Sequence, residues 1–328
     1  MASGVTGAGG STAGTRRPGQ AGAGWRTPLV GVLAVVLPAL LAASGCGRVE
    51  KEKPIAAVIA AAKAGDAAAT HDLIRRFAHP DPLVSEQAWE AVVALGAAAE
   101  PALIEGLAAP DPTVAEFCAG ALGGRSSKAA LAPLTKALES WPRRRYVAAW
   151  ALGEIGDPSA IPALVAALGD KDLEVGKYAA RSLIKFGKEA TDALLKALDS
   201  PAAATRHYAM RALGEIQDPR SADAMLAAGT KVDRAVHLWA LGRLGDKRGF
   251  ETVAAAVTDP ERNTRLAAIQ ALNDLGDERA IPVLTRALAD PEWMIREWAA
   301  RGLESITGNR HRYRNQHGDD VYPYSLYR

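Results

Sequence analysis

A short apolar motif returns along this chain at a nearly constant interval, and that repetition restricts the fold more than any other feature. Ala-Leu-Gly occurs at residues 151–153, 212–214 and 240–242, with degenerate copies elsewhere. The central leucines are 27, 30, 31, 30, 28, 31 and 31 residues apart. They are Leu95, Leu122, Leu152, Leu183, Leu213, Leu241, Leu272 and Leu303. A period of this length is typical of stacked units that bury their apolar faces against their neighbours. The spacing predicts about eight copies of one unit.

Each unit has the pattern of two helices joined by a short turn. Apolar residues recur at helical spacing over residues 159–168 and 280–288, which we interpret as first helices. Residues 145–155 are typical of the second helix, which ends near a glycine. The turn between the two carries aspartate and proline, and there we expect the aspartate to cap free amides and the proline to begin the second helix. These pairs are Asp81-Pro82, Asp111-Pro112, Asp259-Pro260 and Asp290-Pro291.

Composition indicates how such a unit packs. Hydrophobic residues make up 48% of the chain but aromatic residues only 5%, so burial depends on alanine, leucine and valine. Small side chains allow helices to approach closely, which predicts many thin layers instead of one thick core. The near balance of 39 basic and 37 acidic side chains argues against a nucleic-acid partner, which requires an excess of cations on one face. Two cysteines exclude a disulfide framework or a cysteine-rich metal site.

The repeated pattern of helix, Asp turn and Arg-x-x-Ala-Ala-x-x-Leu-Gly resembles HEAT repeats over residues 69–306, specifically the short type found in phycobilisome lyases and many bacterial proteins. The resemblance implies an all-α fold, a right-handed α-solenoid of about eight two-helix repeats whose second helices line the concave side. It also implies a structural arginine ladder, because the family has an arginine seven positions before the anchor leucine that pairs with turn aspartates. The matching residues are Arg145, Arg206, Arg234, Arg265 and Arg296.

The first fifty residues have the order of an export signal. A glycine-rich start is followed by arginines without any acidic residue before Glu50, and then by an uncharged apolar run from Leu29 to Ala43. This run is shorter than the ~20 residues that a bilayer span needs, so a permanent transmembrane helix is the second choice. Residues 43–46, Ala-Ser-Gly-Cys, resemble the bacterial lipobox, which implies lipidation of Cys46. The alternative is an ordinary secretory signal in which Cys46 is incidental.

These segments divide the chain into four parts. Residues 1–45 are predicted to be a signal peptide with a disordered Gly-rich start, and residues 46–53 a linker after the lipidated cysteine. The solenoid occupies residues 54–306, where residues 54–64 form an additional capping helix, and residues 307–328 form a polar tail rich in Tyr and Arg. Because no aspartate follows Cys46, resemblance to enterobacterial lipoproteins favours the outer membrane over the inner membrane as the location of the anchored protein.

Motifs of enzymes are absent from the mature sequence. It contains no glycine-rich phosphate loop, nucleophile elbow or His-x-x-x-His metal pair, so we predict no catalytic residue, metal or cofactor. One group of HEAT proteins hydroxylates a modified lysine with iron bound by His-Glu dipeptides, and here no histidine is followed by glutamate. Cys118 lies at a small apolar helix position and is expected to be a buried, unreactive thiol.

The second helices offer a candidate binding surface. Residues six and two positions before the anchor leucine share one helix face, and in the middle repeats all of them except Ala235 are aromatic or cationic. Together with two adjacent tyrosines they form a stripe suited to an acidic peptide, a sugar chain or a tetrapyrrole carboxylate. The alternative is that Trp150 and Trp239 pack between repeats as core. The stripe consists of Tyr146, Trp150, Lys177, Tyr178, Arg181, His207, Tyr208, Arg211 and Trp239.

Taken together, these patterns predict a non-catalytic HEAT-repeat lipoprotein at the bacterial cell envelope, which binds or scaffolds a protein or an extended peptide and contacts the membrane through its lipid anchor. The resemblance also provides an alternative, a tetrapyrrole (bilin) lyase or chromophore chaperone of the phycobilisome-lyase type. The predicted export signal argues against that alternative, because such a lyase acts beside its acceptor protein in the cytoplasm.

Overall fold

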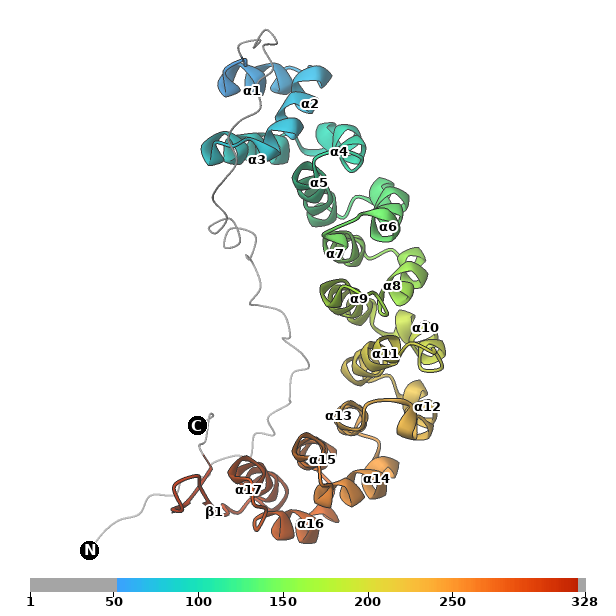
Figure 1. The fold of residues 1–328 in the computed structure, drawn as a ribbon, viewed down its shortest axis with the longest axis vertical. Coiled ribbons are helices and arrows are strands. Elements are labelled where there is room, and N and C mark those ends of the chain that lie inside the picture. The colour runs from blue at the N-terminus through green and yellow to red at the C-terminus, as the bar shows by residue number, and fades with distance from the viewer. Residues whose placement is uncertain (1–51, 324–328) are drawn as a thin grey trace, which may run out of the picture. The chain divides into compact units, whose positions relative to one another are not determined.

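The computed structural model describes residues 52–323. Compact packing divides the chain between Glu52 and Lys53, and all elements below belong to the second unit. The predicted signal peptide and Cys46 lie outside the described residues. Within residues 52–323, the helices alternate between two rows, and the all-α solenoid expected from the repeat is confirmed. In Figure 1 the second helices of the repeats form the inner row of a curved array, and the first helices form the outer row.

The repeats follow an additional N-terminal helix, α1 (Ile55–Lys63). The first helices are α2 (Ala67–Arg75), α4 (Glu100–Gly106), α6 (Leu131–Ser140), α8 (Ile161–Ala167), α10 (Thr191–Ala197), α12 (Ala222–Ala227), α14 (Phe250–Ala255) and α16 (Ala280–Ala287). The second helices are α3 (Pro82–Leu95), α5 (Pro112–Gly124), α7 (Arg145–Ile155), α9 (Leu173–Phe186), α11 (Ala203–Ile216), α13 (Arg234–Leu244), α15 (Arg262–Leu275) and α17 (Trp293–Thr307). A short hairpin of β1 (Tyr313–Arg314) and β2 (Asp320–Val321) follows them.

Aspartates begin the second helices in two different ways. Asp81 and Asp111 are the N-cap residues of α3 and α5, and each accepts a hydrogen bond from the amide two residues later, with proline at the first helical position. Asp259 and Asp290 were predicted to begin α15 and α17 in the same way, and this prediction is wrong. The residues at the N-cap positions of these helices are Glu261 and Glu292, whose side chains form no cap hydrogen bond. There the proline precedes the cap, and the aspartate accepts a bond from the cap residue's own amide at 2.9 and 2.8 Å.

The anchor leucines occupy the centre of the stack. From Leu122 to Leu303 each is at most 1% exposed, so the repeat period corresponds to one buried layer per unit. The first anchor is misassigned, because Leu95 ends α3 and is only half-buried. Val92 is fully buried and lies 30 residues before Leu122, which makes it the equivalent residue. The irregular first spacing of 27 residues was the sign of this shift.

The chain after the last repeat closes the end of the array. Tyr313 of β1 is buried, and β1 packs against α17. Arg296 of α17 donates hydrogen bonds to the carbonyls of Arg314 and Asn315 at 2.7 and 3.3 Å. The hairpin therefore provides for α17 the kind of contact that a following repeat provides for the other second helices.

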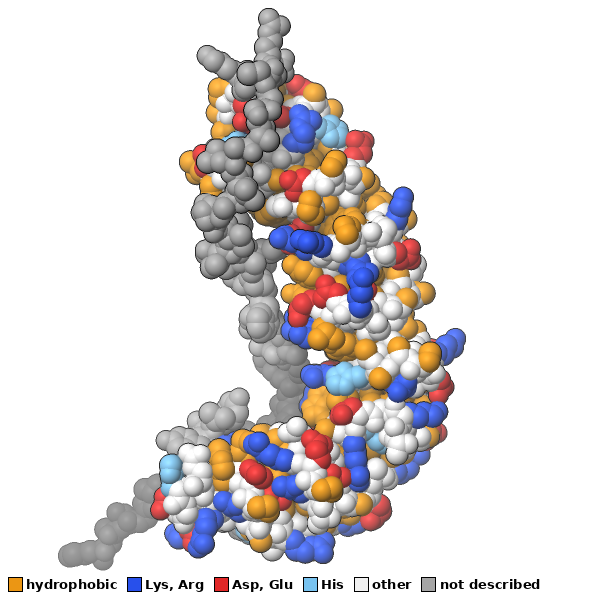
Figure 2. All heavy atoms as spheres, viewed as in Figure 1, with side chains coloured by type: hydrophobic (Ala, Val, Ile, Leu, Met, Phe, Trp, Pro, Cys, Tyr) orange, Lys and Arg blue, Asp and Glu red, His pale blue; other side chains and the backbone are white. Residues whose placement is uncertain are grey.

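Charges in this part of the chain are mixed. Figure 2 shows acidic and basic side chains interspersed over the face turned to the viewer, instead of a broad patch of one sign. Among residues 52–323, none of the helices combines the length and the apolar character needed to cross a membrane.

Candidate functional site

The predicted stripe lies on four consecutive second helices, α7, α9, α11 and α13, which pack against one another in that order. Its aromatic side chains and His207 are half-buried, whereas Lys177, Arg181 and Arg211 are exposed. The repeat period places these residues at matching positions on successive helices of the inner row (Figure 1). The stripe is thus a continuous surface of partly exposed rings with cations among them.

Several rings of the stripe pack on glycines of the helix before them. A Cβ atom added to Gly123 would lie 3.1 Å from the ring of Trp150, and one added to Gly214 would lie 3.0 Å from the ring of Trp239. Tyr208 lies in the same way against Gly176, at 2.8 Å. Each of these rings therefore contributes one side to inter-repeat packing. Trp150 and Trp239 therefore contribute to packing between repeats and keep part of their side chains exposed, and their role as a binding surface stays a prediction.

Ring contacts connect the stripe across the repeats. The rings of Tyr146 and Tyr178 are 5.1 Å apart between centroids, and the guanidinium of Arg181 lies 5.4 Å from the centroid of Tyr178. The guanidinium of Arg211 lies 5.3 Å from the ring of Trp239, which comes from the next helix. Such contacts hold an arginine side chain in place without neutralising its charge.

The cations of the inner row differ in their partners. Lys177 pairs with Glu174 at 2.6 Å, Lys185 with Glu154 at 2.6 Å and Arg243 with Glu215 at 3.4 Å. The pairing with Glu174 also raises the pKa of Lys177. Among residues 52–323, no carboxylate forms an ion pair with Arg181 or Arg211.

His207 differs from the other basic residues of the stripe because it is sheltered from water. Burial lowers its pKa, and Arg211 acts in the same direction, while Asp233 opposes both. Its ring meets Tyr208 edge-on at 5.3 Å. His207 is therefore neutral at pH 7, and the cations of the stripe are Lys177, which pairs with Glu174, and the two arginines, which lie beside rings.

The five arginines of the predicted ladder lie in the first turns of second helices. Each forms hydrogen bonds or ion pairs with the turn between the two helices of its own repeat or of the following repeat. Arg145, Arg234 and Arg265 pair with aspartates 25 residues later, Asp170, Asp259 and Asp290, at 2.7, 2.7 and 2.8 Å. Arg206 instead donates to backbone carbonyls, including that of Lys231, also 25 residues later. Arg296 bonds the carbonyls of Asp290 and Pro291 besides the tail.

A second set of arginine contacts on the loops between repeats was missed in the sequence. Arg220, Arg248 and Arg279 each bind the aspartate two residues before them, and each also reaches an acidic side chain of the preceding first helix. The bonds from Arg220 lower the pKa of Asp218 to about 2. An Asp-x-Arg triplet that recurs at residues 218–220, 246–248 and 277–279 was the available signal.

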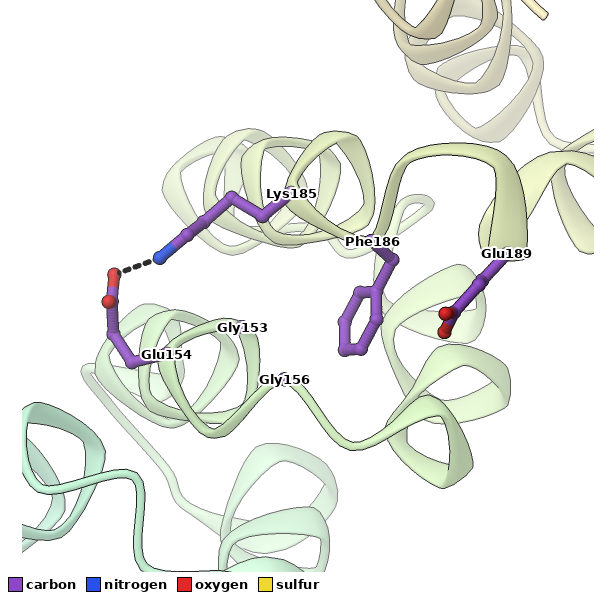
Figure 3. A pocket seen from close by; sticks show the side chains of 6 residues that line it. All are labelled: Gly153, Glu154, Gly156, Lys185, Phe186 and Glu189. Carbon is purple, nitrogen blue, oxygen red and sulfur yellow. Dashed lines mark ion pairs between the residues drawn. The ribbon is translucent and has the colours of Figure 1, made fainter. Parts of the chain in front are cut away.

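Outside the stripe, a small pocket lies between α7 and α9, and a wider hollow lies near α14 and α16. Figure 3 shows the pocket, where the ion pair of Glu154 and Lys185 spans the two helices and Phe186 lies beside Gly156. Neither hollow contains a candidate metal site, since no three His, Cys, Asp or Glu side chains in residues 52–323 are placed to hold an ion.

Cys118 lies in the core of the array and not at the stripe. It is fully buried beside Gly106, and burial raises the pKa of its thiol to about 12. A thiol in this state is a poor nucleophile, because the thiolate is the reactive form.

Comparison with protein families identifies the repeat. The model of HEAT repeats matches residues 100–185, 142–208, 170–237 and 226–304, which together cover more than half of the chain. The chain belongs to the HEAT-repeat family. The resemblance stated from the sequence motifs is therefore confirmed, including its similarity to phycobilisome-lyase repeats.

Two curated proteins are similar to parts of this HEAT-repeat chain. The bilin biosynthesis protein RpcF of Synechococcus sp. (strain WH8020) is 39% identical over 66 residues, 20% of this chain and 32% of that protein. The phycocyanobilin lyase subunit beta of Nostoc sp. (strain PCC 7120) is 32% identical over 92 residues, 28% of this chain and 46% of that protein. The matches thus span less than half the length of either relative.

Among solved structures, the complex of CpcE and CpcF of phycocyanin lyase from Nostoc sp. PCC7120 is similar to this chain. It has 26% identity and a TM-score of 0.41, and the match covers 44% of this chain and 99% of that one.

These relatives correct the functional prediction made from the sequence. The expectation that the chain is not an enzyme is contradicted, because a similar protein is named as a lyase subunit. The comparisons also favour the bilin-lyase alternative over the non-catalytic scaffold. The expectation rested on the absence of compact catalytic motifs, which a repeat surface need not contain.

Proposed function

We propose that this HEAT-repeat protein is of the bilin-lyase type and holds an open-chain tetrapyrrole on its inner stripe while the chromophore is transferred or protected. The observation that carries the proposal is the row of half-exposed rings beside two arginines that pair with no carboxylate of residues 52–323, at matching positions of consecutive repeats. The partial similarity to two proteins of bilin metabolism supports the choice of ligand.

The stripe suits a flat, conjugated and anionic molecule. Partly exposed Tyr and Trp rings provide apolar faces for stacking, and the guanidiniums of Arg181 and Arg211 provide donors for carboxylates. The rings are held from behind by the glycine contacts, so the surface is ordered before a ligand binds. Preorganised binding of this kind contributes to catalysis by positioning the reactants.

Absorbance spectroscopy of the purified protein with a bilin tests the proposal. We expect the visible absorption band of phycocyanobilin to shift and sharpen on binding, and the change to be much weaker for Tyr178→Ala combined with Trp239→Ala. Tyr322→Ala is the matched control, because Tyr322 is an exposed aromatic residue of the C-terminal tail. Addition of an apo-phycobiliprotein then distinguishes the two roles, because a covalent coloured adduct on the acceptor indicates a lyase. An unchanged spectrum with wild-type protein would refute both.

Binding of a protein partner along the inner row is a second candidate function. Arginine and large aromatic residues are enriched at the energetic centres of protein interfaces, and the stripe has this composition. Crosslinking in cells, followed by mass spectrometry, identifies such a partner. Crosslinks to one acceptor protein through the helices of the stripe would support it, whereas crosslinks only through the outer row would contradict it.

The lipid anchor at Cys46 is a further proposal, supported by the order of basic, apolar and small residues before that cysteine. A diacylated cysteine would attach the protein firmly to a membrane surface. Metabolic labelling with an alkyne fatty acid tests it, since the label is expected on wild-type protein and absent from Cys46→Ser. Equal labelling of both would remove the anchor and with it the outer-membrane location.

A further inference from the structure

Arg181 and Arg211 have the same position in two neighbouring repeats. Each lies two residues before a buried anchor leucine, Leu183 or Leu213, so the two side chains emerge from the same face of α9 and α11. These helices pack directly against each other, and packed helices are typically ~8–10 Å apart. The fold therefore places these two arginines at equivalent positions on adjacent helices of the inner row.

The environment of this pair is arranged for anions. Nearby cations of the inner row are neutralised within the protein, namely Lys177 by Glu174 and Lys185 by Glu154. Arg181 and Arg211 are exposed, and within the described residues their recorded contacts are with rings and not with acids. A guanidinium placed in this way retains its hydrogen-bonding capacity for a planar carboxylate.

Rings lie on both sides of the pair and between its members. Tyr178 packs toward α7 and contacts Tyr146, and Arg181 lies over its ring. Beyond Arg211 the ring of Trp239 reaches back from α13 to Gly214. Tyr208 of α11 packs on Gly176 of α9, in the space between the two helices that carry the arginines. Along the stack, rings therefore flank each arginine, with Tyr178 on one side, Trp239 on the other and Tyr208 between the two helices.

We propose that Arg181 and Arg211 form a two-point carboxylate clamp that selects a conjugated ligand with two carboxylates near its middle and flat rings at its ends. Linear tetrapyrroles have this chemistry, because their two propionates are attached to the central rings. The inference rests on the proposed function and adds what the stripe recognises: each arginine binds one propionate, and the outer rings of the ligand stack toward Tyr178 and Trp239.

Binding of biliverdin and of biliverdin dimethyl ester, followed by absorbance titration, tests the clamp. The ester keeps the conjugated system but removes both negative charges. We expect wild-type protein to bind the free acid about a hundredfold more tightly than the ester, about tenfold for each arginine. Arg181→Gln combined with Arg211→Gln is expected to bind the two compounds equally, with losses of about tenfold in acid affinity for each arginine replaced.

Two further variants complete the experiment. Arg286→Gln removes an exposed arginine from α16 of the outer row and is expected to leave the preference for the acid unchanged. Arg181→Lys combined with Arg211→Lys retains the charges and is expected to keep part of the preference, which excludes a folding defect as the cause of its loss. Equal binding of acid and ester by wild-type protein, or a full preference in the double Gln variant, would overturn the clamp while bilin binding persists. No binding of either compound by wild-type protein would overturn the clamp and the proposed function together.

Discussion

Between consecutive second helices, the residue after one anchor faces the residue before the next anchor. Gly123 faces Ala151, Gly153 faces Ser182 and Gly214 faces Ala240, in each case so closely that an added Cβ would collide with the neighbour. At the last interface the sizes are exchanged, because Asn273 occupies the glycine position and Gly302 faces it. The approach of the repeats thus depends on one small residue in each facing pair, and close packing tolerates little added volume.

Two glycines of α5 test this dependence. A Cβ at Gly123 would lie 2.7 Å from the Cα of Ala151, whereas one at Gly120 would have no neighbour within 4 Å. Gly123→Ala is therefore expected to lower the free energy of unfolding by about 1–3 kcal/mol through overpacking. Gly120→Ala is expected to raise it by up to about 1 kcal/mol, because alanine favours the helix. Denaturant titrations of both variants provide the comparison, and equal effects would contradict this account.

Elements are joined at both edges of the stack by arginines that reach from one repeat to the next. One edge of the stack holds the turns that join the first and second helix of each repeat. There Arg265 pairs with Asp290 and also donates to the carbonyl of Asp259. Both side chains of the pair are nearly buried, at 12% and 8% exposure. On the other edge, Arg279 donates to the carbonyl of Lys247 and contacts Glu251. Charge-assisted hydrogen bonds therefore hold the loops in place at the edges of the stack, which the small apolar side chains of the core do not reach.

The buried pair should contribute more to stability than an exposed one. Arg265→Ala is expected to lower the free energy of unfolding by about 1.5–3 kcal/mol, because Asp290 and two carbonyls lose their charged donor. Lys231→Ala removes the partner of Asp199 in a pair whose side chains are 60% and 74% exposed, and less than about 1 kcal/mol is expected. Urea unfolding of the two variants measures and compares their losses in free energy of unfolding. A larger loss for Lys231→Ala would contradict the importance of burial.

At the scale of the whole repeat unit, stability is distributed along a line. The main contacts of a second helix are with the second helices before and after it and with adjacent first helices. The C-terminal end is covered by the tail hairpin, in which Tyr322 lies 4.4 Å from the guanidinium of Arg310. In arrays of this kind, a change at one end acts mainly on the repeats next to it.

Removal of the tail tests this local coupling. A chain that ends at Gly308 loses the hairpin and the two carbonyls of the tail that accept from Arg296, so α16 and α17 are expected to open more often. Amide hydrogen exchange should be at least tenfold faster in these two helices and unchanged in α3 to α5. Acceleration that is uniform along the array would show instead that the repeats unfold as one cooperative unit.

Much of the fold was predictable because one period controls it. From Leu122 on, the anchor leucines recur about every 30 residues and each occupies a buried layer, so pattern and burial coincide. The predicted positions were wrong at the first anchor leucine and at Asp259 and Asp290. At each of these places the local sequence fits two positions relative to the helix, and the folded backbone determines which one occurs. Asp-x-Arg was visible but was not interpreted, because its second partner lies in another repeat.

The sequence by itself determined that the chain forms a stack of two-helix layers, because periodic burial requires neighbouring units of equal size. It also placed the aromatic and basic residues on one register of the second helices. Which cations of residues 52–323 stay unpaired follows from the tertiary structure alone, because pairing depends on side chains from adjacent helices, as with Lys185 and Glu154. The tertiary structure likewise decided that Trp150 and Trp239 rest on glycines of the preceding repeat, since that contact joins residues about 25 positions apart. The candidate clamp of Arg181 and Arg211 is therefore a property of the assembled layers.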